Sequence, residues 1–225
     1  MVVRAQKNAT LDEPDAGERW GGLVQDRDSR FIVAAATGRI GETLVAEAVA
    51  ETAERTTQEP LAWCSDGWQG YPAVIERQYR QPRSTGKRGR PRLCLPDTIQ
   101  LTQRIKHRDE HGRVRSIETR AVFGLPIAAA GTVHVERLNG TLRDRLNALT
   151  RKTHAFAKRD ATWDALLLLQ CFEHNWVRSH PALHAPSTDP ARRYQQRSPA
   201  MVLGLTDHIW SWQELLTTRR TITPG

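Results

Sequence analysis

The sequence at residues 61–71 reads Leu61-Ala62-Trp63-Cys64-Ser65-Asp66-Gly67-Trp68-Gln69-Gly70-Tyr71. Its first half is a short apolar run, which predicts a buried strand, and Ser-Asp-Gly marks the end of that strand. A helix through Ile75 and Tyr79 is predicted to follow. Asp66 therefore falls at the carboxyl end of a strand, where open α/β sheets commonly place their chemistry. An Asp before a Gly is also common in ordinary turns, and that alternative stays open at this point.

A second informative stretch reads Val135-Glu136-Arg137-Leu138-Asn139-Gly140-Thr141-Leu142-Arg143. At about 100° per residue, Glu136, Asn139 and Arg143 share one sector of a predicted helix. An apolar stripe of four leucines faces elsewhere: Leu138, Leu142, Leu146 and Leu149. Such a helix suits a metal-ligating carboxylate placed beside phosphate-binding groups. The alternative is an ordinary amphipathic helix on which Glu136 pairs with a nearby arginine.

The rest of the chain alternates between strand and helix patterns, which predicts an α/β fold. Strand patterns occur at Trp20–Gln25, Phe31–Ala36, Thr98–His107 and Arg113–Phe123. Helical patterns occur at Gly41–Arg55 and Thr162–Arg178, with a short one around Trp212–Leu216. We expect the run Ala165–Leu169 to be buried on most sides of its helix.

At 225 residues, the chain is long enough for one domain with a proper core. We expect this domain to span residues 1–180 and to contain a basic insertion, a β-hairpin, at about 80–124. Residues 181–225 are rich in Pro and Arg. They predict an irregular carboxyl-terminal tail that carries the short helix.

Three motifs occur in one order: Ser65-Asp66-Gly67-Trp68 with Tyr71, then Glu136-Arg137 with Asn139 and Arg143, then Arg151-Lys152-Thr153 with Phe156 and Lys158. This order resembles the catalytic domain of insertion-sequence transposases of the Asp-Asp-Glu type. The resemblance extends to further stretches and covers nearly the whole chain: Arg19-Trp20, Asp26–Ala34, Phe172–His180 and Ser198–Trp210.

The resemblance implies a ribonuclease-H-like domain, in which a mixed sheet is flanked by helices. It implies that Asp66 and Glu136 are catalytic and bind two Mg²⁺ or Mn²⁺ ions for phosphodiester cleavage and strand transfer. The implied partner is DNA, both transposon ends and target, on which the protein assembles as a homo-oligomer. The implied DNA-binding residues in these motifs are Arg137, Asn139, Arg143, Arg151, Lys152 and Lys158.

The sequence departs from the family pattern at its amino terminus. The first catalytic Asp of these transposases lies in an Asp-Glu-x-Trp-x-Phe-Val strand, whereas Met1–Asn8 resembles only the end of that strand. We therefore expect an incomplete first strand, a chain that begins after the Asp, and impaired catalysis. Asp12 and Asp26 are alternative third acids. Pro14 and the surrounding residues favour a loop at Asp12, and the residues around Asp26 suit a hairpin turn.

The net charge of +8 and a pI of about 10.0 indicate attraction to a polyanion. Twelve of the 33 Lys and Arg residues lie between Arg80 and Arg120. Within this segment, Gly86–Arg92 resembles an AT-hook, in which arginines enter a narrow minor groove. The candidate contacts there are Lys87, Arg88, Arg90 and Arg92. A solvated, flexible basic connector is the alternative.

The sequence contains no apolar run of the roughly twenty residues that a membrane helix needs and no apolar signal core. We expect a cytoplasmic protein that does not enter a membrane. Cys64, Cys94 and Cys171 are widely spaced, which argues against a disulfide framework or a zinc site.

Three functional hypotheses follow. The first is a DNA transposase that is impaired by loss of the first Asp. The second is a noncatalytic DNA-binding or inhibitory transposase fragment. The third is a junction-resolving nuclease, which would use similar carboxylates without strand joining.

Overall fold

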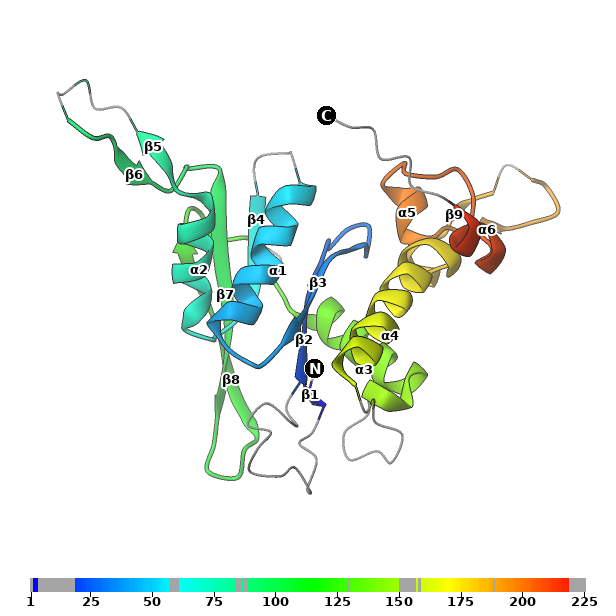
Figure 1. The fold of residues 1–225 in the computed structure, drawn as a ribbon, viewed down its shortest axis with the longest axis horizontal. Coiled ribbons are helices and arrows are strands. Elements are labelled where there is room, and N and C mark those ends of the chain that lie inside the picture. Colours follow the sequence, from blue (N-terminus) through cyan, green and yellow to red (C-terminus); the bar gives the residue numbers. More distant parts are fainter. Residues whose placement is uncertain are drawn as a thin grey trace.

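The first sheet of the computed structural model is an antiparallel meander of three strands in the order β1-β2-β3 (Figure 1). These strands are β1 (Val2–Val3), β2 (Arg19–Gln25) and β3 (Ile32–Gly38). The structure describes residues 2–3, 19–56, 61–83, 86, 89–128, 130–149, 157, 159–187 and 189–218.

A tight turn joins β2 to β3. Asp26 Oδ2 accepts a hydrogen bond from the Ser29 backbone N–H at 2.8 Å, and Asp26 N–H donates to the Phe31 carbonyl at 2.8 Å. Arg30 adopts φ 63°, a left-handed conformation that is uncommon outside glycine. The hairpin predicted around Asp26 is therefore confirmed, and Asp26 stabilises its turn.

Helix α1 (Glu42–Arg55) covers one face of this sheet. Ala36, Leu44 and Ala48 form a buried cluster, against which Trp20 and Val24 pack. An acidic residue in the first turn of the helix and a basic one in the last turn favour the helix dipole.

The second sheet has the order β4-β7-β8, with β4 parallel to β7 and β7 antiparallel to β8. Its strands are β4 (Leu61–Asp66), β7 (Ile99–Arg108) and β8 (Val114–Phe123). The β7–β8 turn is held by Asp109 Oδ1, which accepts from the backbone N–H groups of His111 and Arg113. The predicted hairpin is confirmed. Its first strand, β7, is the central strand of the sheet.

Helix α2 (Gly70–Tyr79) follows β4 and packs with α1 over one face of this sheet. Their shared core contains Val49 of α1, Val74 of α2 and Leu101 of β7. A separate two-stranded arm, β5 (Gln81–Arg83) and β6 (Arg92–Cys94), projects from the body beside α2 (Figure 1). The basic segment 80–124 thus contains this arm and two strands of the second sheet.

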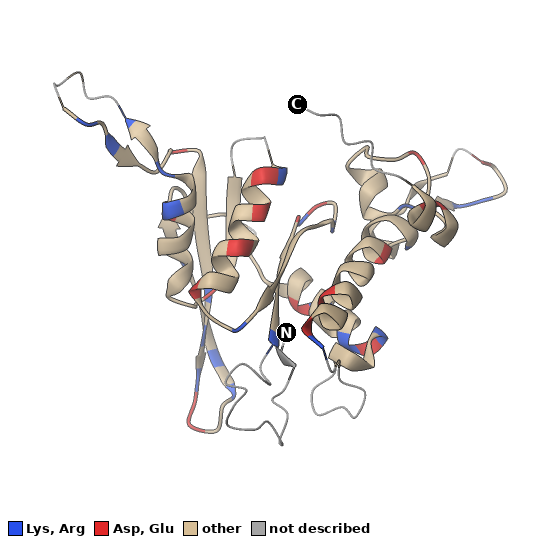
Figure 2. Cartoon of the chain, in the orientation of Figure 1, with Lys and Arg blue, Asp and Glu red and all other residues tan. Residues whose placement is uncertain are grey.

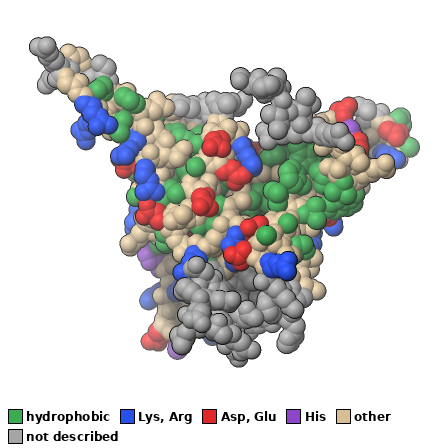
Figure 3. Space-filling view, viewed as in Figure 1, with side chains coloured by type: hydrophobic (Ala, Val, Ile, Leu, Met, Phe, Trp, Pro, Cys, Tyr) green, Lys and Arg blue, Asp and Glu red, His purple; other side chains and the backbone are tan. Residues whose placement is uncertain are grey.

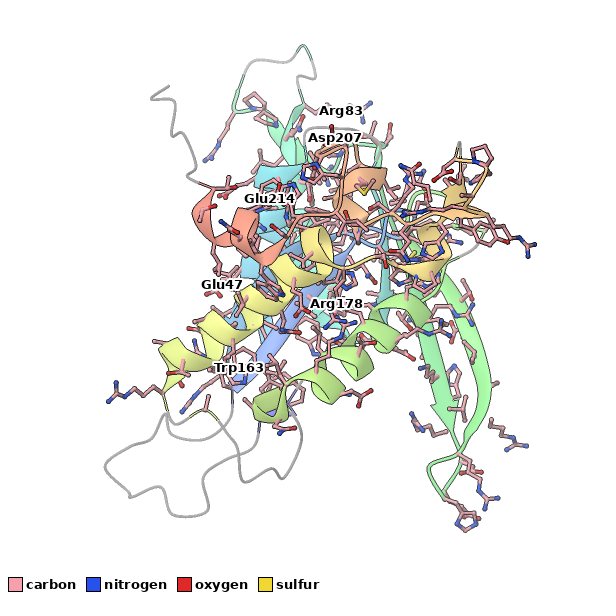
Figure 4. The ribbon with its side chains drawn as sticks, turned by 90° about the vertical axis from the view of Figure 1, so that its right-hand side faces the viewer. Glu47, Arg83, Trp163, Arg178, Asp207 and Glu214 are labelled. Atoms are coloured by element: carbon pink, nitrogen blue, oxygen red, sulfur yellow. The ribbon has the colours of Figure 1, made fainter. Side chains whose placement is uncertain are left out.

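Two helices cover the other face of the first sheet. They are α3 (Val133–Arg145) and α4 (Asp160–Phe172), with the 3₁₀ turn η1 (Asn147–Leu149) between them in sequence. Leu138, Leu142 and Leu149 pack with Trp163 of α4 and with Ile32 of β3. Figure 4 labels Trp163, whose side chain lies between these two helices. The first sheet is therefore the middle of three layers, helix, sheet and helix.

The burial pattern of α4 differs from the prediction. Leu167 is 1% exposed, but Leu168 is 51% and Leu169 is 38% exposed. The run is exposed on one side because only one side of α4 meets the sheet and α3. Figure 3 shows hydrophobic side chains gathered over this region of the surface.

The chain after α4 begins with a π-helical turn, η2 (Glu173–Val177). Asn175 in this turn donates from Nδ2 to the Ile32 carbonyl at 3.0 Å and accepts from the Ile32 N–H at 2.8 Å. Trp176 packs against Trp210 with ring centroids 4.7 Å apart. The remaining elements are η3 (Pro181–Leu183), β9 (Ala185–Pro186), β10 (Tyr194–Gln195), α5 (Pro199–Val202) and α6 (Trp212–Thr217).

The fold is mixed α/β, as predicted from the sequence. None of the helices in the described residues is long and apolar enough to cross a membrane.

Candidate functional site

Asp66 is the last residue of β4, as the sequence predicts, and it is exposed. Its Oδ1 accepts a hydrogen bond from the Trp68 backbone N–H at 3.1 Å. A Cβ on Gly67 would lie 3.0 Å from Ile105 Cγ1, so glycine allows the chain to turn closely over β7. The loop therefore presents the Asp66 carboxylate at the end of the strand.

The register of β4 and β7 fixes the face on which Arg104 lies. Trp63 and Leu101 are register partners and contact the core under α1 and α2. Asp66 pairs with Arg104, three positions further along each strand, and side chains alternate between the two faces of a sheet. Arg104 therefore points away from α1 and α2. Burial raises the pKa of Tyr71 in α2, and Asp66, the last residue of its strand, lies near enough to α2 to add to this rise.

The same face carries the start of α3. Arg104 donates from its NH1 nitrogen to the Ala130 carbonyl at 3.2 Å. Lys106 lies two residues further along β7, and its Nζ forms an ion pair with Glu136 Oε1 at 2.6 Å. Strand β7 thus links the end of β4, through the register partner of Asp66, to the first turn of α3, through Lys106.

The Glu136 carboxylate accepts hydrogen bonds from two side chains. Thr132 Oγ1 donates to Glu136 Oε1 at 2.8 Å, in addition to the Lys106 ion pair. The hydrogen bond from Lys106 is the main cause that lowers the pKa of Glu136, and burial opposes it. The Glu136 side chain is 50% exposed, so its carboxylate remains open to solvent.

Gln103 supports the loop after β4 from the opposite face. It is 4% exposed and donates from Nε2 to the carbonyls of Asp66 and Trp68, both at 3.0 Å. Gln103, Arg104 and Lys106 were not predicted from the sequence as parts of the site. The sequence feature that could have indicated them is a run of long polar side chains inside a strand whose first half is largely buried.

Three further predicted residues lie along α3. Arg137 is exposed, whereas Asn139 and Arg143 are half-buried. Asn139 Oδ1 is shielded from solvent and has no hydrogen-bond partner among the described residues. Of the predicted basic contacts in the arm, Arg90 and Arg92 are exposed. Lys87, Arg88, Arg151, Lys152 and Lys158 lie outside the described residues, as does Asp12.

Asp66 and Glu136 together offer oxygen donors, which are the ligands that Mg²⁺ and Mn²⁺ prefer. The ammonium group of Lys106 neutralises the Glu136 carboxylate, so a cation bound there would have to replace part of this ion pair. The described residues contain no group of three or more His, Cys, Asp and Glu residues arranged to hold a metal ion. Within the described part of the chain, Asp66 and Glu136 are the two carboxylates that the resemblance assigns to a divalent cation.

No family model matches the chain, and no curated protein or solved structure matches it at a significant level. Function must therefore be argued from the motifs and from the geometry of this site.

Proposed function

We propose that this chain is the catalytic domain of a DNA transposase of the Asp-Asp-Glu type, with a ribonuclease-H-like fold. The observation that carries the proposal concerns strand β7. Arg104 of this strand is the register partner of Asp66, and Lys106, two residues further along, forms an ion pair with Glu136. Two acids that lie 70 positions apart in sequence are thereby linked through one strand.

The order of elements supports the same proposal. An antiparallel meander is followed by a helix and then by β4, which runs parallel to β7. An acid at a strand end and another on a late helix are the two positions that the resemblance assigns to metal ligands. Asp66 ends β4, and Glu136 lies in the first turn of α3.

The two carboxylates would hold the divalent cations. Bound there, the metal would lower the pKa of an attacking water or 3′-hydroxyl and stabilise the leaving 3′-oxygen at a phosphodiester. Glu136 would exchange part of its contact with Lys106 for the cation. The displaced ammonium group is then free to pair with a DNA phosphate, and Arg137 on the same turn offers a second cationic contact.

The third acid of the family belongs on the first strand. The described residues of that strand, Val2 and Val3, carry no carboxylate, and Asp26 is engaged in its turn. Two carboxylates alone would fix the cation geometry poorly, so we expect cleavage to depend on a further acid. A chain without such an acid would behave as a noncatalytic DNA-binding fragment.

The test compares the chain as given with a version preceded by an Asp-Glu-x-Trp-x-Phe-Val strand. Each is incubated with Mn²⁺, a labelled duplex with a free 3′-hydroxyl, and plasmid DNA. We expect the added strand to raise cleavage and joining, and E136Q or D66N to abolish the gain. E110Q is the matched control, since Glu110 is 86% exposed at the far tip of the β7–β8 hairpin.

Retained activity in extended E136Q would reject the assignment of Glu136. Cleavage without joining would favour a junction-resolving nuclease. Efficient cleavage by the unextended chain that D66N abolishes would mean that an acid such as Asp12 completes the site.

A further inference from the structure

Basic side chains gather where three elements meet: the β2–β3 turn, the first turn of α3 and the segment after η2. Arg27 and Arg137 both act electrostatically on Arg30. Arg30 and Arg137 also act electrostatically on His180, as do His134 and His184. We call these residues the basic junction: Arg27, Arg30, His134, Arg137, His180 and His184.

The elements that carry the basic junction are fixed to one another. The Arg30 carbonyl accepts hydrogen bonds from His174 Nε2 and Gln25 Nε2, both at 2.9 Å. The Asn175 side chain forms hydrogen bonds with both the N–H and the carbonyl group of nearby Ile32. Ile32 also packs against Leu138 of α3 in the core. The turn, α3 and η2 therefore form a preorganised frame, which keeps the cost of ordering a binding site low.

Among the described residues, the arginines of the junction form no ion pair with a carboxylate, since the ion pairs found there involve other arginines. The acids that act electrostatically on Arg30 are Asp28 and Asp26 of its own turn, and Asp26 also accepts from Ser29. Burial lowers the pKa of Arg30, Asp28 opposes this shift, and Arg27 adds to it. The two acids of the turn therefore offset part of the positive charge that the three arginines bring to the junction.

Two imidazole nitrogens in the junction are also unsatisfied. His180 Nδ1 and His184 Nε2 are shielded from solvent without a hydrogen-bond partner among the described residues. Buried polar atoms in native proteins nearly always have a partner, so each such atom calls for an explanation. A ligand that accepts hydrogen bonds would satisfy them if these nitrogens carry the proton.

The first turn of α3 adds donors. The helix begins at Val133, and its N-cap residue Thr132 makes no side-chain cap. Backbone N–H groups at such a helix start, with the positive end of the helix dipole, favour an anion.

We propose that the basic junction binds a phosphate group of a polynucleotide backbone. Arginine forks and imidazole N–H groups match the several acceptor oxygens of a phosphate. A polynucleotide suits the site better than a free phosphate because Arg27 and Arg137 are exposed at its rim, where a continuing chain of phosphates can reach them. The proposal uses neither Asp66 nor Glu136 and stands whether or not the chain cleaves DNA.

The binding test measures the fluorescence anisotropy of a labelled oligonucleotide in EDTA, which removes cleavage from the readout. The variant R27Q/R137Q removes two exposed charges of the junction. R159Q/R192Q is the matched control, since both arginines are exposed and lie outside the basic junction and outside the segment 80–124. We expect the junction variant to lose about tenfold or more in affinity for the oligonucleotide and the control to lose clearly less. The reason is that hydrogen bonds to charged groups contribute more to binding than those between neutral groups. Equal losses would overturn the proposal.

A second measurement locates the ligand. Imidazole ¹H–¹⁵N NMR spectra of the wild-type chain are recorded with the oligonucleotide and, separately, with inorganic phosphate. We expect the resonances of His180 and His184 to shift at micromolar oligonucleotide and only at millimolar phosphate. Shifts that saturate at low phosphate with no gain from the oligonucleotide would reject a polynucleotide in favour of a small phosphate ligand. Unmoved resonances with both ligands would reject the site.

Discussion

At the scale of single residues, His174 is a buried group whose protonation affects stability. It is 7% exposed and donates from Nε2 to the Arg30 carbonyl. Burial lowers the pKa of His174 from 6.5 to about 4, while the hydrogen bond to Arg30 opposes this shift and His180 adds to it. The imidazole is therefore neutral in the folded protein at neutral pH.

This pKa predicts a loss of stability in mild acid. Below pH 6.5 the unfolded chain binds a proton that the folded chain excludes, so stability is full above that pH and falls as the pH drops toward 4. Between pH 7 and pH 5 the loss from this residue is about 2 kcal/mol. Urea unfolding of wild type and H174Q at both pH values measures it.

Glutamine keeps an N–H donor near Arg30 but does not titrate, so H174Q is expected to lose about 2 kcal/mol less than wild type over this interval. The other acidic groups contribute equally to both proteins. Equal losses would show that His174 is not the neutral, buried group described above.

At the scale of elements, helix α4 offers a matched pair of neighbouring leucines. Leu167 is 1% exposed and packs in the core with Trp163 and Leu142, whereas Leu168 is 51% exposed. We expect L167A to lower the free energy of unfolding by about 3 kcal/mol because it leaves a cavity, and L168A to lower it by less than about 1 kcal/mol. Urea titrations decide this. Similar losses would mean that α4 is rotated from the orientation found here.

Elements whose patterns are local were predictable from the sequence. The alternation of β2 and β3, the helical spacing of α1 and the Ser-Asp-Gly end of β4 each depend on near neighbours along the chain. Asp66 and Glu136 were assigned to a strand end and a helix for the same reason. The position of β7 between β4 and β8 was not predicted, because strand order depends on contacts far apart in sequence.

The parts of the site that were missed are likewise non-local. Lys106 and Glu136 lie 30 positions apart, and Asn175 and Ile32 lie 143 positions apart. In the sequence, neither Lys106 nor Asn175 differs from an ordinary lysine or asparagine, because the partner of each is brought close only by the fold. The basic junction was overlooked because its six residues come from three separate segments.

At the scale of the whole molecule, charge is unevenly distributed. Figure 2 shows acidic residues along α1 and Lys and Arg residues along β5, β6 and the β7–β8 hairpin. A net charge of +8 concentrated in this way predicts DNA binding with little sequence preference.

This binding should weaken steeply with salt, because each neutralised phosphate releases counterions. Anisotropy titrations at two salt concentrations measure the slope of log affinity against log salt. We expect R90Q/R92Q to reduce both affinity and slope, and R159Q/R192Q, which removes two exposed arginines outside the segment 80–124, to change them less. Affinity that does not depend on salt would contradict this prediction.

The outer edge of β3 is protected by side chains that are synthesised at different times. β3 is the last strand of its sheet, and side chains occupy its outer backbone groups: Asn175 at Ile32, Arg55 at the Val33 carbonyl and Glu51 at the Ala35 N–H. Glu51 and Arg55 leave the ribosome soon after the strand, but Asn175 follows Ile32 by 143 residues. At about 5–20 residues per second, that is roughly 7–30 seconds of synthesis. During this interval the nascent chain exposes the start of β3 to pairing with other chains, so slow or stalled translation of the second half should increase misassembly of the first.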